Sequence, residues 1–162
     1  MPDVICNTSP VQYLHQVNLL HILHELYGPI ALPEGVLTEL DAGRMTGISL
    51  PDVKSLSWFS VKYVRGRNLL QMVSGLGIGE KEVLALALET PESLAILDDL
   101  LARRYASFLG VRFTGTLGIL LKAKEKGLLD AVAPVLDQLE ALQFRLDPKT
   151  REAVLKLAKE TS

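Results

Sequence analysis

The chain has 162 residues, 48% of them hydrophobic and 22% charged, and its formal net charge is −2. This length and composition are typical of one globular domain, and they argue against a protein that coats nucleic acid through a strongly basic surface. The single cysteine excludes an internal disulfide and a cysteine-rich zinc site.

Expected strands and helices alternate from the start of the chain. A first strand is expected at residues 4–6, with Cys6 as a buried, inert thiol inside it. Ser9 as N-cap and Pro10 at the first helical position then begin a helix that Tyr27-Gly28-Pro29 ends. The first half continues with a strand at 30–32, a helix at 34–42 that Gly43 stops, a strand at 58–64 and a short helix near 69–73.

The second half keeps the same alternation and ends in helices. It contains helix 80–89, strand 94–97, helix 100–108, strand 111–113 and helices 116–126, 130–142 and 148–159, the last capped by Asp147. Strands separated by helices pair in parallel through right-handed crossovers. We therefore expect an α/β protein, a three-layer α/β/α fold with a five-stranded parallel sheet and extra C-terminal helices. It forms one domain over residues 1–162, with a core at about 1–145 and a C-terminal helix at 146–162.

Side chains that carry oxygen ligands are expected to gather at one edge of this sheet. Asp98 and Asp99 directly follow a buried strand, where open parallel sheets bind their ligands. Glu80 begins a buried helix, Glu39 lies on the inward-facing side of another, and Asn7 follows the first strand. Mg²⁺ and Mn²⁺ prefer oxygen ligands, and such an ion lowers the pKa of bound water and neutralises phosphate charge. The pattern therefore indicates a divalent-metal site.

Each of these residues also has a structural explanation. Glu80 lies in a first helical turn, where the helix macrodipole favours an acid. One of Asp98 and Asp99 is able to cap the following helix, but not both. Glu39 alone fits an exposed helix position, and Asn7 fits an Asx-turn onto the backbone that follows it. Only the joint placement of these residues favours a functional site.

Five segments of the chain form an ordered set. They are Asn7-Thr8-Ser9-Pro10, PEGVLTEL at 33–40, GEKEVLALA at 79–87, LDDLLARR at 97–104 and GTLGILLKAK at 115–124. In this order they resemble the PIN-domain superfamily, which includes VapC-type toxin ribonucleases, over residues 4 to about 145. The resemblance is to an uncharacterised PIN-like branch that has asparagine in place of the first aspartate.

This resemblance implies cleavage of RNA with Mg²⁺ or Mn²⁺ as cofactor. It also implies which residues carry the chemistry. The acids of the family fall on Glu39, Glu80 and Asp99, with Asp98 as an alternative to Asp99. All four are therefore expected to be catalytic, and Glu39, Glu80 and Asp99 to ligate the metal.

Asn7 stands where catalytic PIN domains usually carry aspartate, so it is also expected to be catalytic and to offer one neutral oxygen to the metal. The family's hydroxyl beside this position falls on Thr8 or Ser9, and we expect both to bind substrate. Arg65 and Arg67, in a glycine-rich segment, are expected to contact its phosphates. The missing charge leaves two outcomes open: either the site compensates for it, or activity is reduced or absent.

Two functions of different classes therefore compete. The first is a metal-dependent ribonuclease, the toxin of a toxin–antitoxin pair, with RNA and an antitoxin protein as partners. The second is a catalytically weak or inactive PIN-like module that binds RNA or a protein. The retained acids favour the first, and Asn7 favours the second. A receiver-type regulatory domain is disfavoured, because Phe113-Thr114-Gly115 lacks the lysine that it needs after the last strand.

A homodimer is expected from an apolar stripe on a late helix, to which Trp58-Phe59 adds aromatic surface. The stripe consists of Val132, Val135, Leu136, Leu139 and Leu142. It also fits a helix that covers the sheet of its own chain. No apolar run reaches the roughly 18 residues of a membrane-spanning helix, and no secretion signal begins the chain. A cytoplasmic protein without a membrane partner is therefore expected.

Overall fold

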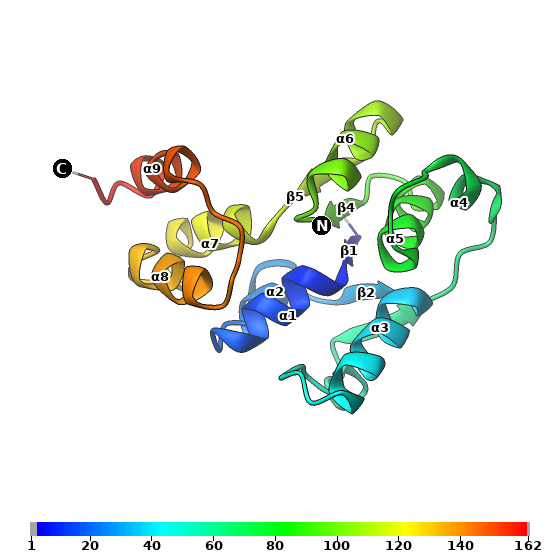
Figure 1. Cartoon of the computed structure of the whole chain (residues 1–162), viewed down its shortest axis with the longest axis horizontal. Helices are drawn as coiled ribbons and strands as arrows, with labels where there is room; N and C mark the ends of the chain where they lie inside the picture. Colours follow the sequence, from blue (N-terminus) through cyan, green and yellow to red (C-terminus); the bar gives the residue numbers. More distant parts are fainter. Residues whose placement is uncertain (1–2, 162) are drawn as a thin grey trace.

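The computed structural model describes residues 3–161, and Figure 1 shows its strands running between two groups of helices. The strand order in the sheet is β3-β2-β1-β4-β5. The strands are β1 (Val4–Cys6), β2 (Ile30–Pro33), β3 (Phe59–Lys62), β4 (Leu94–Ile96) and β5 (Arg112–Thr114). Every neighbouring pair is parallel, so the expected three-layer α/β/α fold with five parallel strands is confirmed.

The helices divide between the two faces of the sheet. They are α1 (Thr8–Gln16), α2 (His21–Tyr27), α3 (Glu34–Met45), α4 (Asn68–Met72), α5 (Ile78–Glu89), α6 (Leu100–Leu109), α7 (Thr116–Glu125), α8 (Ala133–Ala141) and α9 (Pro148–Leu157). Helix α5 packs on β1, β2 and β4 and against α3, α4 and α6. Helices α1 and α2 pack against α7, and α8 and α9 lie beyond α7 at one end of the molecule (Figure 1). Within residues 3–161, no helix has both the length and the apolar character to cross a membrane.

Strand β1 is buried along its whole length because helices cover both faces of the sheet. Cys6, its last residue, is 0% exposed. Burial, together with the nearby Asp98 carboxylate, raises the pKa of the Cys6 thiol well above its ordinary value. Because the thiolate is the reactive form, Cys6 is the buried, inert residue that was expected.

The strand order reverses between β1 and β4. From β1 the chain passes to β2 and β3 on one side, and it then crosses back to β4 and β5 on the other. Open parallel sheets bind ligands at such a switch point, outside the carboxyl ends of the strands. Asn7 follows β1, and its backbone N–H donates to the carbonyl of Ile96, the last residue of β4, at 3.1 Å. The residues that follow β1 and β4 therefore lie together at this crevice.

The N-terminal helical region differs from the expected one. It consists of two helices, α1 and α2, because Asn18 between them takes the left-handed backbone conformation with φ 61°. Ser9 is not its N-cap, since α1 already begins at Thr8. Pro10 still fits the first turn, where backbone N–H groups have no helical acceptor.

Gly43 does not stop α3, which runs on to Met45. The glycine instead leaves room for Leu50, whose Cδ1 would overlap a Cβ at this position. The segment after Leu50 also forms one turn of 3₁₀-helix, Val53–Ser55, which the sequence pattern did not indicate.

The apolar stripe on α8 belongs to the core of its own chain. Its buried members, none more than 6% exposed, are Val132, Val135, Leu136 and Leu139. Trp58 is also engaged within the chain, because its ring stacks on His24 and Phe59 with centroids 5.4 and 4.1 Å apart. These four residues of the stripe are therefore not available to a partner, whereas Leu142 is exposed, and the dimer stays a prediction.

Glu160 fastens the C-terminal helices to the rest of the fold. Its carboxylate accepts hydrogen bonds from the Val132 and Ala133 backbone N–H groups at 2.7 and 2.9 Å and from Lys124 Nζ at 2.9 Å. Burial opposes ionisation, but these three donors outweigh it and hold the pKa of the Glu160 carboxyl below its usual range. The end of the chain is thus bound to α7 and to the start of α8. Asp147 caps α9 as expected, accepting from the Thr150 N–H at 2.9 Å.

Replacing Glu160 by glutamine is expected to loosen this attachment and to lower the melting temperature by about 2–6 °C at pH 7. Because the folded-state pKa is lowered, the stabilisation is complete above the unfolded-state pKa and is lost as the pH falls through the folded value. The melting temperatures of the two proteins should therefore converge in acid. Calorimetric melts across pH test this, with Glu152→Gln on the exposed face of α9 as the control. Equal melting temperatures at pH 7 would contradict the role of Glu160.

Candidate functional site

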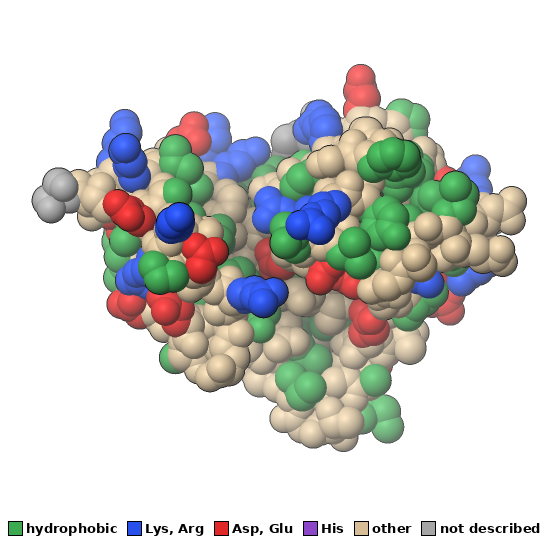
Figure 2. Space-filling view, turned by 45° about the horizontal axis from the view of Figure 1, so that its top comes forward, with side chains coloured by type: hydrophobic (Ala, Val, Ile, Leu, Met, Phe, Trp, Pro, Cys, Tyr) green, Lys and Arg blue, Asp and Glu red, His purple; other side chains and the backbone are tan. Residues whose placement is uncertain are grey.

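A cleft of about 490 Å³ opens at the carboxyl edge of the sheet. Glu80, Asp98 and Asp99 are among the residues that line it, and so are residues from the segment 143–150. In Figure 2, acidic side chains lie in the hollowed middle of the face shown, with basic side chains beside them. The structure thus brings three of the expected acids to one cavity.

Asp98 is held by the start of α7. Its Oδ1 accepts a hydrogen bond from the Thr116 backbone N–H and its Oδ2 one from the Thr116 hydroxyl, each at 2.7 Å. Gly115 permits this approach, because a Cβ there would lie 2.8 Å from Asp98 Oδ1. Burial raises the pKa of the Asp98 carboxyl, although the Thr116 hydrogen bonds and the Arg103 charge act against it. Asp98 therefore joins β4 to α7 with both of its oxygens.

Asp99 has a different environment. Its Oδ2 accepts a hydrogen bond from the Ala102 N–H at 2.9 Å and so caps α6, the structural role expected for one of the two aspartates. Its side chain is exposed, and within residues 3–161 its Oδ1 makes no hydrogen bond. Asp99 is thus the aspartate with an oxygen to offer to a ligand.

Glu39 and Glu80 approach each other across the first turn of α5. A Cβ placed on Gly77 would lie 3.6 Å from Glu39 Oε2 and 3.8 Å from Glu80 Oε1, so both carboxylates face the same small volume. The Thr8 hydroxyl donates a hydrogen bond to Glu39 Oε1. The backbone of Gly79 packs directly on the Glu39 carboxylate, because a Cβ on Gly79 would overlap Glu39 Oε1.

The pKa of the Glu80 carboxyl is raised at this place. Burial raises the pKa of its carboxyl, and the neighbouring charges of Asp99 and Glu39 raise it further, against a hydrogen bond from the Gly77 N–H at 3.2 Å. The Glu80 carboxyl on α5 is therefore under the influence of one carboxylate from α3 and one from the N-cap of α6. A carboxyl whose pKa is raised by burial and by neighbouring charges is common at sites that bind cations or move protons.

Asn7 has an unsatisfied oxygen. Its side chain is 4% exposed, and Oδ1 is the one buried side-chain oxygen or nitrogen within residues 3–161 that has no hydrogen-bond partner. The Asx-turn considered for this residue is therefore absent. An unpaired buried acceptor costs about 1–3 kcal/mol, so Asn7 Oδ1 indicates a partner that completes the site.

The donor set fits a divalent cation of the magnesium type. It offers the carboxylate oxygens of Glu39, Glu80 and Asp99 and the unpaired Oδ1 of Asn7. Within residues 3–161, no three acidic, histidine or cysteine side chains stand close enough to form a ready-made metal cluster. Magnesium needs no such cluster, since it keeps several waters and is bound through one or two carboxylates together with substrate phosphates.

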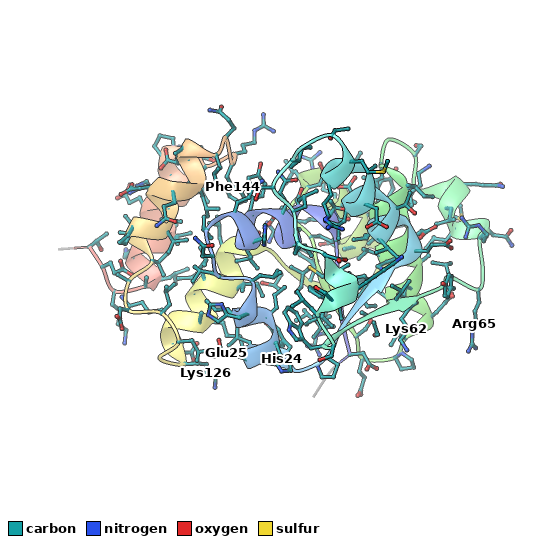
Figure 3. The ribbon with its side chains drawn as sticks, turned by 90° about the horizontal axis from the view of Figure 1, so that it is seen from below. His24, Glu25, Lys62, Arg65, Lys126 and Phe144 are labelled. Atoms are coloured by element: carbon teal, nitrogen blue, oxygen red, sulfur yellow. The ribbon has the colours of Figure 1, made fainter. Side chains whose placement is uncertain are left out.

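The two arginines expected at phosphates lie elsewhere. The Arg65 N–H donates to Glu89 Oε1 at 2.7 Å, and Glu89 is at the opposite end of α5 from Glu80. Figure 3 shows Arg65 near Lys62 and far across the view from Phe144, a residue that lines the cleft. Arg67 is paired with Glu82 through Nη2 and Oε2 at 3.3 Å. Of the two hydroxyls, Ser9 lines the cleft and Thr8 binds Glu39.

Glu82 is a structural acid that was not among the expected site residues. It is 5% exposed, and its Oε1 accepts the Gly35 N–H at 2.7 Å, which ties α5 to the start of α3. Helical periodicity is a signal that could have found it, since Gly79, Val83 and Leu86 share its buried face. The segment 143–150 was also missed, and no local pattern connects it to the acids.

Two comparisons with known proteins bear on the chain. Among models of protein families, the one described as a PIN domain matches residues 3–160. No curated protein matches the chain. The matched range contains β1–β5 and every acid of the cleft.

Replacing Gly79 by alanine is expected to displace the Glu39 carboxylate, because the new Cβ would overlap Glu39 Oε1. Gly77→Ala is the matched control, since its Cβ would remain at ordinary contact distance, 3.6 Å from Glu39 Oε2. Crystal structures of both variants provide the measurement: the hydrogen bond between Thr8 and Glu39 should be lost in Gly79→Ala alone. Its survival in that variant would contradict the packing described.

Proposed function

The chain belongs to the PIN-domain family, whose members are in general nucleases, and from this premise we propose that it is an Mg²⁺- or Mn²⁺-dependent endoribonuclease. The observation that carries the proposal is the approach of the Glu39 and Glu80 carboxylates to one small volume beside Gly77, with Asp99 close enough for its charge to act on Glu80. Carboxylates that repel one another are stabilised by a divalent cation between them. A purely structural role for Glu39 and Glu80 would not require their carboxylates to face one small volume.

The residues proposed to hold the cation are Glu39, Glu80 and Asp99, with Asn7 through its Oδ1. When bound, a divalent cation lowers the pKa of water and neutralises charge on a phosphate. The protein's own contribution is to fix the ligands. Thr8 holds Glu39 by a hydrogen bond, and capping of α6 holds Asp99.

Other groups of the cleft are available to the substrate. The Ser9 hydroxyl lines it and is able to donate a hydrogen bond to a phosphate oxygen. Asp98 fixes the start of α7 through Thr116, so we assign it a positioning role beside the ligands. We propose that Arg65 and Arg67 contact phosphates of the RNA where it extends beyond the cleft.

We also propose that the chain is the toxin of a toxin–antitoxin pair, which acts in the cytoplasm as a homodimer and is neutralised by a protein partner. Membership of the PIN-domain family, to which toxin ribonucleases belong, is what supports this. This role requires more than nuclease activity, and a separate experiment tests it. The chain should co-purify with the product of a small adjacent reading frame.

A second function has two observations in its favour. Asn7 contributes no negative charge where an aspartate would, and within residues 3–161 the acids do not form a ready-made cluster. A PIN-like module that binds RNA or a protein without cleaving it would have these properties. The two substitutions below separate this module from the nuclease.

Asp99→Asn is expected to abolish activity without destabilising the fold. Asparagine caps a helix as well as aspartate does, so the melting temperature should change little, while the loss of a charged ligand should lower RNA cleavage about 100-fold or more. Cleavage of a fluorescent single-stranded RNA with Mn²⁺ is the assay. Asp130→Asn, at an exposed position, is the matched control. Full activity of Asp99→Asn would remove Asp99 from the site.

Asn7→Asp is expected to add the missing charge. Without metal, a fourth carboxylate should lower the melting temperature, because like charges in one buried site repel. With Mn²⁺ or Mg²⁺, the thermal stabilisation and the calorimetric affinity should both exceed those of the wild type, and RNA cleavage should rise. Equal metal affinities, with no cleavage by either protein, would overturn the nuclease and leave the binding module.

A further inference from the structure

The cleft has a cationic side that the proposed metal ligands do not use. Arg103 of α6 and Arg145 of the connection between α8 and α9 both line it. In the part of the chain that the structure describes, neither guanidinium is within ion-pair distance of a carboxylate, whereas Arg67 and Arg151 are held in ion pairs. Two unpaired guanidinium groups therefore share a cavity with the acids.

Arg103 lies beside Asp98, close enough for its charge to act on that carboxyl, but within residues 3–161 it forms no ion pair. Its Cζ lies 5.0 Å from the centroid of the Phe113 ring, a cation–π contact that fixes the side chain. A Cβ on Gly115 would lie 3.8 Å from Arg103 Nη1 and 2.8 Å from Asp98 Oδ1, so both groups face the same glycine. Thr116 binds both oxygens of Asp98, and within residues 3–161 the Arg103 guanidinium makes no hydrogen bond. The Arg103 donors are thus left for a ligand.

Arg145 is presented by a segment that is anchored on both sides. Before it, Phe144 packs edge-on against Tyr13 of α1, with ring centroids 4.9 Å apart at 89°, and the Phe144 N–H donates to the Leu139 carbonyl at 3.0 Å. Figure 3 shows Phe144 beside α1. After it, Asp147 caps α9 with one oxygen and binds the Thr150 hydroxyl with the other. The backbone that carries Arg145 is therefore fixed against the cleft.

We propose that Arg103 and Arg145 form a clamp for the phosphates of the RNA that this site is proposed to cleave. A guanidinium binds phosphate through two parallel hydrogen bonds. The acids of the cleft repel a polyanion, and a net charge of −2 provides no general attraction, so local cations have to hold the RNA. The segment 143–150 is then part of the substrate site, and the C-terminal helices are the support that holds it there.

Binding of a fluorescein-labelled single-stranded RNA in EDTA, followed by fluorescence anisotropy over a range of salt concentrations, tests the clamp. Arg103→Gln and Arg145→Gln should each weaken binding about 10-fold. Each should also lower the slope of log K against log salt by about 0.7, the value for one lost phosphate contact on a single strand. Arg104→Gln, on the same helix as Arg103 but outside the cleft, is the control and should leave the slope unchanged.

The outcomes separate the clamp from the nuclease proposal. The arginine variants should bind Mn²⁺ at least as tightly as the wild type in calorimetry, because removing a cation does not weaken the attraction of the acids for metal. Loss of RNA binding in these variants supports the clamp even where the wild type cleaves nothing. Arg145 is exposed, so Arg145→Gln is expected to fold. It tests the clamp even if Arg103→Gln unfolds. A wild type that does not bind the RNA, or binding and a salt slope that neither substitution changes, overturns the clamp.

Discussion

Parallel pairing on both sides of β1 is the constraint from which the site follows. A strand in that place has to be apolar on both faces, so its polar residues occur only beyond its end. After β1 the chain turns to one side of the sheet and after β4 to the other, and the crevice between them receives Asn7 and Asp98. Oxygen ligands from distant parts of the chain thus meet without being adjacent in sequence.

Three acidic side chains of the fold pack directly against the backbone of a glycine. In three pairs the carboxylate lies where a Cβ on the glycine would press against it: Glu82 with Gly35, Glu39 with Gly79 and Asp98 with Gly115. A larger residue at any of these glycines would have to push an acid aside. The glycines beside the acids in the sequence segments therefore have a steric explanation. They let charged groups approach backbone and one another inside a fold with few buried charges.

Sequence reasoning was successful where the physical signal is local. Short apolar runs mark strands buried on two faces, and the doublet Asp98-Asp99 after such a run located the carboxyl edge of the sheet. It failed where the decisive contact is distant in sequence. Arg65 was expected at phosphates of the site, but its backbone binds Glu89 at the other end of α5, 24 residues away, so it lies outside the cleft. The arrival of Arg145 at the cleft depends on the packing of Phe144 on Tyr13, which no periodicity in either segment indicates.

Cys6 has a practical consequence for study of this chain. It is the only cysteine in the sequence, and it lies in the core with a thiol that burial keeps protonated. Maleimides and related reagents attack thiolates, so the native fold presents them with no target. A cysteine introduced at an exposed position would be the sole point of attachment for a fluorophore or spin label. Pairs of introduced cysteines, one on each side of the cleft, would therefore make distances across it measurable in solution without first removing a native thiol.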